Sequence, residues 1–278
     1  MDIRFGFYGK LPGLGDFVSR GWSNDARDGF DRLLQEAVGE LLHSGSGREA
    51  IANAPDLLLA LKPGLVCGDG LTIAMTPSAD RVGRQFPLTL GVQWREGAAD
   101  GINNWPSLDY GRALINCARR CLDAGSSADE LCAAIAGLGS PDWFQPSFRG
   151  TGEDDTMPRL PKDAKLIRVR GPLAPMAPVL TALCKSLNGA SELLGFVLDA
   201  RGEVQHCVIG RRLLSGAPLA ALFDGGWPSR GWLPYGDASE QPKGESPPAV
   251  TVDDDVTLPR GKPFDAGREG RDSDPNNM

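Results

Sequence analysis

The segment Gly9–Asp16 is the first in the sequence whose residues could do chemistry, because it combines three glycines with a lysine. A glycine-rich loop of this kind can surround a phosphate with backbone N–H groups while the lysine supplies positive charge. The phosphate-loop pattern also needs a glycine five residues before its Gly-Lys pair and a Ser or Thr after it. Arg4 and Leu11 hold those positions here. Two interpretations stay open: a loop that binds a nucleotide or phosphate, and a tight turn in which Lys10 and Asp16 are solvated or paired.

A second polar segment, Pro77–Pro87, lies between two apolar stretches and contains Asp80, Arg81 and Arg84. An arginine guanidinium can hold a carboxylate through two parallel hydrogen bonds, which suits recognition of an acidic group on a partner. The same residue types also form internal Asp–Arg bridges that tie a connection to a sheet. The sequence does not choose between a binding role and a structural role for these three residues.

The sequence predicts no catalytic residue, no cofactor-binding residue and no metal ligand. It has only two histidines, His43 and His206, and it lacks the Gly-x-Ser-x-Gly motif of a serine nucleophile. Its six cysteines are spread through apolar segments, and the pair Cys117 and Cys121 lacks the spacing of a zinc ribbon. We therefore interpret the cysteines as small buried side chains in a reducing compartment.

Charge and hydropathy narrow the class of protein further. The 29 basic and 36 acidic residues give a net charge of −7, whereas a nucleic-acid-binding domain usually carries a basic face. No stretch approaches the ~20 apolar residues of a membrane-spanning helix, and the first residues lack the apolar core of a secretion signal. We expect a cytoplasmic protein that neither binds nucleic acid nor inserts directly into a membrane.

The elements that must position the two polar segments follow from the spacing of apolar residues. Residues 25–43 place apolar side chains at helical intervals, which predicts one amphipathic helix with a wide stripe: Phe30, Leu33, Leu34, Ala37, Val38, Leu41 and Leu42. Ser127 precedes Glu130 by three residues, the spacing of a capping box at the start of a helix. The apolar runs 193–198 and 204–209 flank a turn-like segment and predict a β-hairpin. Further strands are predicted at 3–8, 57–61, 71–75, 86–94 and 166–169, further helices at 106–124, 175–187 and 218–223, and a long loop at 145–162.

These elements divide the chain into two parts. Residues 1–235 predict an α/β domain in which a mixed sheet is covered by helices on both faces. Residues 236–278 hold ten acidic residues, five basic residues, six prolines and five glycines. Such a segment buries too little apolar surface to offset its chain entropy, so we expect an acidic, Pro/Gly-rich disordered tail.

Two blocks of the sequence carry a family resemblance. They contain Gly6-Phe7-Tyr8-Gly9-Lys10-Leu11-Pro12 with Gly15-Asp16-Phe17-Val18, and Pro77-Ser78-x-Asp80-Arg81-Val82-Gly83-Arg84-x-Phe86-Pro87-Leu88. Their order and spacing resemble the signatures of the TagF family, also called ImpM, whose members are accessory proteins of bacterial type VI secretion. The clear resemblance covers residues 5–95.

The resemblance implies a three-layer α/β/α sandwich and a cytoplasmic, non-enzymatic regulator. TagF proteins are associated with post-translational repression of type VI secretion through binding of the forkhead-associated scaffold protein Fha. The candidate interaction or loop-fixing residues are Lys10, Asp16, Asp80, Arg81 and Arg84. Two alternatives remain: a nucleotide- or phosphate-binding protein that uses the glycine-rich loop, and a structural component of the secretion apparatus. A double-mutant cycle on Asp16 and Arg84 would separate pairing of these two residues from independent roles.

Overall fold

The computed structural model describes residues 3–43, 47–95, 105–106, 108–139, 143–144, 166–170, 193–210 and 216–235. Most of the predicted elements lie within these ranges and can be compared with the structure. The predicted loop at 145–162, the predicted helix at 175–187 and the predicted tail at 236–278 lie outside the described residues.

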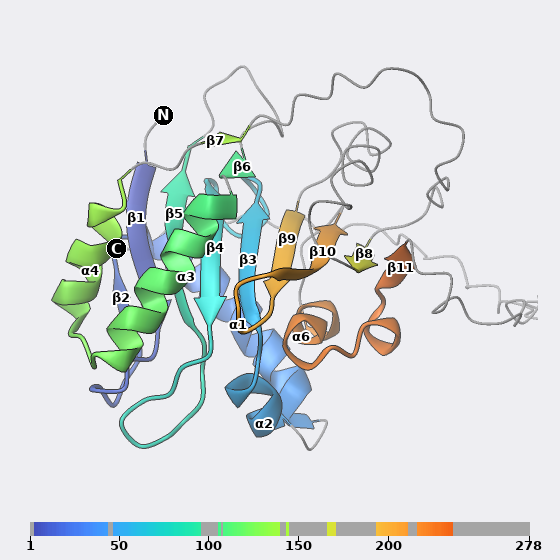
Figure 1. The fold of residues 1–278 in the computed structure, drawn as a ribbon, viewed down its shortest axis with the longest axis horizontal. Coiled ribbons are helices and arrows are strands. Elements are labelled where there is room, and N and C mark those ends of the chain that lie inside the picture. Colours follow the sequence, from blue (N-terminus) through green and yellow to red (C-terminus); the bar gives the residue numbers. More distant parts are fainter. Residues whose placement is uncertain are drawn as a thin grey trace, which may run out of the picture. The chain divides into compact units, whose positions relative to one another are not determined.

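The fold is mixed α/β and is organised around one sheet with the strand order β11-β8-β10-β9-β3-β4-β5-β1-β2 (Figure 1). The strands are β1 Ile3–Gly9, β2 Val18–Arg20, β3 Asp56–Leu61, β4 Gly70–Thr76, β5 Leu88–Trp94, β8 Leu166–Arg170, β9 Leu193–Leu198, β10 Val204–Gly210 and β11 Leu233–Tyr235. A separate two-stranded sheet pairs β6 (Trp105–Pro106) with β7 (Trp143–Phe144). Of the pairings in the large sheet only β11 with β8 is parallel, so the sheet is mixed through a single pair of strands.

The middle of the sheet joins segments that are far apart in the sequence. Strand β3 pairs antiparallel with β4 on one side and with β9 on the other. In the second pairing Leu57 lies opposite Val197 and Leu61 lies opposite Leu193. The N-terminal strands and the C-terminal strands therefore form one continuous sheet through the contact of β3 with β9.

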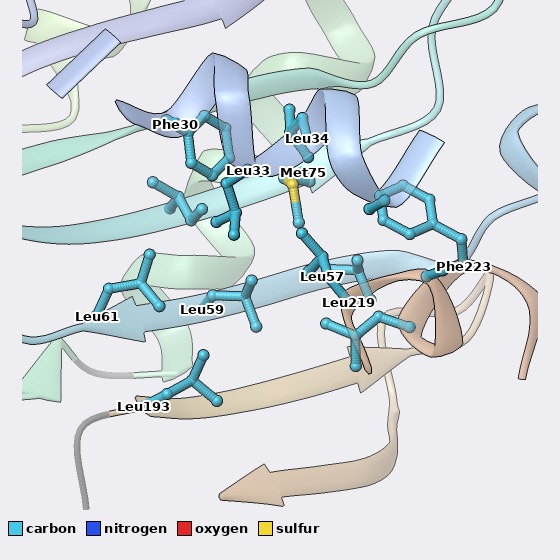
Figure 2. Close-up of a cluster of buried hydrophobic side chains, with 14 of the residues drawn as sticks. Phe30, Leu33, Leu34, Leu57, Leu59, Leu61, Met75, Leu193, Leu219 and Phe223 are labelled. Carbon is cyan, nitrogen blue, oxygen red and sulfur yellow. The ribbon is translucent and has the colours of Figure 1, made fainter. Parts of the chain in front are cut away.

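Helices pack against this sheet through two separate hydrophobic clusters. Their bounds are α1 Asn24–His43, α2 Gly47–Ala52, α3 Leu108–Asp123, α4 Ala128–Gly137 and α6 Ala217–Asp224, followed by a 3-10 turn, η1 Pro228–Arg230. Helices α1, α2 and α6 share a cluster with Leu57, Leu59 and Leu61 of β3. Figure 2 shows the side chains of α1, β3 and α6 in this cluster. Helices α3 and α4 share the other cluster with Leu58. Successive side chains of a strand point to opposite faces, so β3 contributes alternate leucines to the two clusters.

Helix α1 follows the predicted apolar stripe, although the stripe is narrower than predicted. Phe30, Leu33 and Leu34 are buried, whereas Leu42 is 49% exposed. At 3.6 residues per turn, Leu42 lies about 120° around the helix from Phe30, beyond the edge of the buried face. The backbone N–H of Ala26 donates to Ser23 Oγ at 3.2 Å, which satisfies one of the unpaired donors at the start of the helix.

The capping box predicted at Ser127 is present at the start of α4. Ser127 Oγ accepts the Glu130 backbone N–H, and the Glu130 carboxylate accepts the Ser127 backbone N–H at 2.7 Å. One other predicted boundary was wrong. The helix predicted from residue 106 begins at Leu108, because Pro106 belongs to β6. The structure also contains the short helix α2, which begins at Gly47 and which no predicted element covers.

Candidate interaction site

The two signature segments leave the sheet at the same end. Strand β5 lies between β1 and β4 and is antiparallel to both, so β1 and β4 end where β5 begins. Tyr8 of β1 and Met75 of β4 both pair with Thr89 of β5, which brings the two exits to one level. We call residues 10–17 the β1–β2 loop and residues 77–87 the β4–β5 loop; both connections lie at the end of the sheet toward which the β4 arrow points (Figure 1).

Asp80 is the centre of the contact between these loops. Its side chain is fully buried, and its carboxylate accepts hydrogen bonds from Lys10 Nζ at 2.7 Å and from Arg84 Nε at 2.6 Å. The other carboxylate oxygen accepts the backbone N–H groups of Val82 at 3.0 Å and of Arg84 at 2.9 Å. Lys10 is also almost fully buried. The carboxylate therefore folds its own loop and binds the neighbouring loop at the same time.

The hydrogen bonds at Asp80 set its ionisation. Removal from water acts to raise the pKa of the carboxyl, but the hydrogen bonds from Lys10, Arg84 and Val82 act in the opposite direction and outweigh it. The pKa of Asp80 lies well below its usual range as a result. Asp80 is therefore a structural carboxylate, ionised at all physiological pH values and saturated with donors.

Further hydrogen bonds to carbonyl groups of the β1–β2 loop join the two loops. Ser78 Oγ donates to the Lys10 carbonyl at 2.7 Å, and the Arg81 N–H donates to the Leu14 carbonyl at 2.9 Å. The Arg84 guanidinium, besides its bond to Asp80, donates to the Gly15 carbonyl. Together these bonds connect the β1–β2 loop to the β4–β5 loop along most of their length and make them a single structural unit.

The predicted candidate residues divide into two groups. Lys10, Asp80 and Arg84 come together in one ion-paired cluster, which fits a loop-fixing role. Asp16 and Arg81 are exposed, and neither forms an ion pair with another described residue. Arg84 pairs with Asp80 rather than with Asp16, so the Asp16–Arg84 pairing considered from the sequence does not occur in the structure.

The geometry of the β1–β2 loop argues against phosphate binding. That function needs the Lys10 amine to point into an open concavity, whereas the amine is bonded to Asp80 and nearly inaccessible. The loop also closes on itself, because the Leu14 N–H donates to the Leu11 carbonyl at 3.0 Å. The lysine that suggested a phosphate site is used to join the two loops.

Sequence reasoning missed the apolar side chains that the loops expose. The exposed large hydrophobic residues of the described chain are Leu14, Phe17, Leu42 and Val82, with exposed fractions of 40%, 47%, 49% and 67%. All but Leu42 belong to the two loops. A signal was available, because an apolar residue in a polar, glycine-rich loop has no helical or strand periodicity that would direct it into a core.

The Phe17 side chain packs against other aromatic rings on one side and is exposed to solvent on the other. Its ring stacks on Tyr8 with centroids 5.6 Å apart, meets Phe86 edge-on at 4.6 Å, and lies 5.0 Å from Lys10 Nζ. The Tyr8 hydroxyl donates in turn to Asp31 of α1. Burial, together with the Asp31 carboxylate, raises the pKa of Tyr8 far above its usual value, so this donor stays protonated. The exposed ring therefore rests on a fixed support.

The part of the chain that contains the two loops matches a known protein family. Residues 6–138 match the family model described as "TagF N-terminal domain, Type VI secretion system-associated". These residues form a TagF N-terminal domain. The family resemblance found in the two sequence blocks is thereby confirmed, and both loops lie inside the matched range.

A solved structure resembles the TagF domain and its continuation. It is a crystal structure of PA0076 from Pseudomonas aeruginosa PAO1, with a TM-score of 0.56 and 23% sequence identity over 80% of this chain and 94% of that chain. At this identity the likeness shows the fold alone. No significant sequence match to the chain was found among curated proteins.

Within the described ranges, no group of three or more His, Cys, Asp or Glu side chains converges as metal ligands would. Over the same ranges, no helix combines the length and the apolar character needed to cross a bilayer. What the two loops offer is a rigid surface with exposed apolar and guanidinium groups, which is chemistry suited to binding another molecule.

Proposed function

We propose that this chain is a non-enzymatic, cytoplasmic regulator of the type VI secretion system that represses secretion after translation by binding the forkhead-associated protein Fha. The match of residues 6–138 to the TagF N-terminal domain carries this proposal. The loop geometry supports it, because Lys10, Asp80 and Arg84 bind one another at the centre of the loops, while the loops expose apolar side chains, two arginines and a single carboxylate, Asp16.

We also propose that residues 1–235 form one domain of the three-layer α/β/α type, with residues 236–278 as a separate appendage. The two hydrophobic clusters support the layered arrangement, because α1 packs with Leu57 and Leu59 while α3 and α4 pack with Leu58. Side chains that alternate along one strand face opposite sides of the sheet.

The test of the regulatory function is capture of Fha from cells with active type VI secretion. The full chain is used as bait, and the bound proteins are identified by mass spectrometry. Recovery of Fha, together with loss of effector secretion when the chain is overproduced, is the expected result. Recovery of baseplate subunits at high salt in place of Fha would instead make the chain a structural component of the apparatus. A melting temperature that rises with added nucleotide, with no secretion protein recovered, would favour the small-molecule alternative.

A further inference from the structure

We infer that Leu14, Phe17 and Val82, together with the guanidinium groups of Arg81 and Arg84, form the docking surface of this protein, and that its occupant is a partner segment that combines an apolar side chain with flanking carboxylates. We call these five residues the loop patch. The inference rests on the proposed function, because it places the contact with the regulated partner on this patch.

The first argument is the concentration of exposed apolar surface. Three of the four exposed large hydrophobic side chains of the described chain lie on two loops that are joined to each other. The Arg81 N–H to Leu14 carbonyl bond places Leu14 beside the residue that precedes Val82. Single exposed apolar residues are ordinary on a protein surface, whereas a group rimmed by polar residues is typical of an interaction site.

The second argument is rigidity. Binding energy is lost when flexible side chains and loops must be ordered at an interface. Here the Asp80 carboxylate fixes the main chain of its own loop, hydrogen bonds from Ser78, Arg81 and Arg84 tie the two loops together, and Phe17 already packs on Tyr8 and Phe86. An aromatic ring that is half exposed and held in place has the properties of an interface anchor, because it offers a large contact area at little entropic cost.

The third argument is charge, which selects the chemistry of the occupant. Within the loops Lys10 and Asp80 neutralise each other in the buried cluster. Arg84 uses its Nε–H and one Nη2–H internally, yet its side chain remains 60% exposed, and Arg81 is exposed beside it. Asp16 is the only exposed carboxylate of the two loops. The loop patch is thus locally cationic on a chain whose net charge is −7, which favours an acidic partner segment and disfavours a symmetric contact with the same patch of a second copy.

The experiment measures binding of purified full-length variants to purified Fha by biolayer interferometry. Val82→Ser removes the most exposed apolar side chain of the loop patch, and Phe17→Ala removes the anchor. Leu42→Ser is the matched control, because Leu42 is the exposed hydrophobic residue that lies on α1 and outside the loops. Arg81→Glu tests the charge, with Arg48→Glu on α2 as its control. Circular dichroism and the melting temperature confirm that each variant is folded.

We expect Phe17→Ala to weaken the affinity about 30-fold, as loss of an interface anchor does, and Val82→Ser to weaken it by a smaller factor. Arg81→Glu should lower the association rate constant and flatten its dependence on salt, while Leu42→Ser and Arg48→Glu bind like the wild type. Wild-type affinity in all three loop-patch variants would overturn the inference and leave the proposed function intact. Failure of the wild-type chain to bind Fha would overturn the proposed function and, with it, the occupant named here. A dimer that is lost on Val82→Ser but not on Leu42→Ser would also overturn the inference, since the occupant would be a second copy.

Discussion

Two aromatic groups that lie toward opposite edges of the large sheet use the same kinds of ring contact but differ in their exposure to solvent. In the loops, Phe17 stacks on Tyr8 and meets Phe86 edge-on, and the Lys10 ammonium lies 5.0 Å from its ring. In the C-terminal part, Trp227 meets His206 at 5.1 Å and Trp232 at 5.7 Å, and the Arg168 guanidinium lies 5.4 Å from its ring. We call these the loop group and the tryptophan group. The tryptophan group is buried at Trp227 and Trp232, whereas the loop group leaves about half of Phe17 in solvent.

The difference in exposure suits the tryptophan group to stabilising the fold and the loop group to contacting another molecule. A ring enclosed on all sides contributes its whole buried area to the stability of the fold. A ring enclosed on one side contributes less and keeps a rigid apolar face available for another molecule. The tryptophan group ties η1 and the segment before β11 to α6, since Trp232 Nε1 donates to the Pro218 carbonyl at 2.9 Å. The loop group offers its remaining surface outward.

The largest expected effect in this comparison is on the buried side. Trp232→Ala should reduce the free energy of unfolding by about 3–5 kcal/mol, because it empties a fully enclosed site and removes the hydrogen bond from Trp232 Nε1 to the Pro218 carbonyl. Urea denaturation followed by circular dichroism measures this loss. Phe17→Ala under the same conditions should lose much less, and equal losses would contradict the distinction between the two groups.

Asp80→Asn should have the next largest effect and should also change the response to acid. The substitution leaves the buried Lys10 amine without its anion and weakens the support of both loops. Because the pKa of Asp80 is lower in the folded state than in the unfolded chain, its ionised form adds stability above about pH 4, and that stability is lost as the pH falls further. Melting temperatures from pH 7 to pH 2 should therefore fall less steeply in the variant. Equal slopes would show that Asp80 does not stabilise the loops through its charge.

Phe17→Ala should destabilise the fold modestly, by about 1–2 kcal/mol, because two aromatic contacts are lost from a side chain that is half exposed. Chemical denaturation gives the change in stability, and the binding assay described above gives the change in affinity. We expect the two quantities to change by different amounts, with a small loss of stability and a large loss of affinity. A large loss of both would make Phe17 a core residue like Trp232.

Ser127→Ala should have the smallest effect on the free energy of unfolding, and the other variants can be compared with it. Removing the side-chain acceptor of the capping box should cost about 1 kcal/mol, with no change in binding, since α4 lies outside the loops. Thermal denaturation measures the cost, and Asp129→Ala, one residue into α4, controls for loss of a polar side chain near the helix start. A loss as large as that of Trp232→Ala would mean that α4 stabilises far more of the sheet than its own first turn.

The sequence predicted those features that depend on local patterns. The capping box at Ser127, the hairpin of β9 with β10 and the apolar strands β3 and β4 all follow from residues close to one another in the chain. Features that depend on distant partners were not predictable in this way. Lys10 and Asp80 are 70 residues apart, and their contact follows from the shared pairing of β1 and β4 with β5. The short strand β2 and the half exposure of Phe17 likewise depend on neighbours that no local pattern reveals.

The antiparallel character of the sheet was also beyond local pattern. Interleaved helices and strands predicted a mixed sheet, whereas in the described sheet every pairing except that of β11 with β8 is antiparallel, including that of β4 with β5. The roles of the candidate residues could be predicted only in part from the sequence. Their charges were visible in the sequence, but the pairing of Arg84 with Asp80, which leaves Asp16 unpaired among the described residues, required the register of the strands.

The pairing of β3 with β9 affects how the chain folds during synthesis and which fragments of it can fold. During synthesis β3 emerges with apolar residues along its whole length, and its second neighbour follows only after more than one hundred further residues. Until then, one edge of the central strand is open to other chains, a situation that favours aggregation and slows folding. The match to the TagF N-terminal domain ends at residue 138, so β3 and α1 lie inside the matched range. Their partners β9 and α6 lie outside it. A fragment cut at that boundary keeps both loops but leaves β3 at the edge of its sheet, so expression of the intact chain is the safer route to a folded protein.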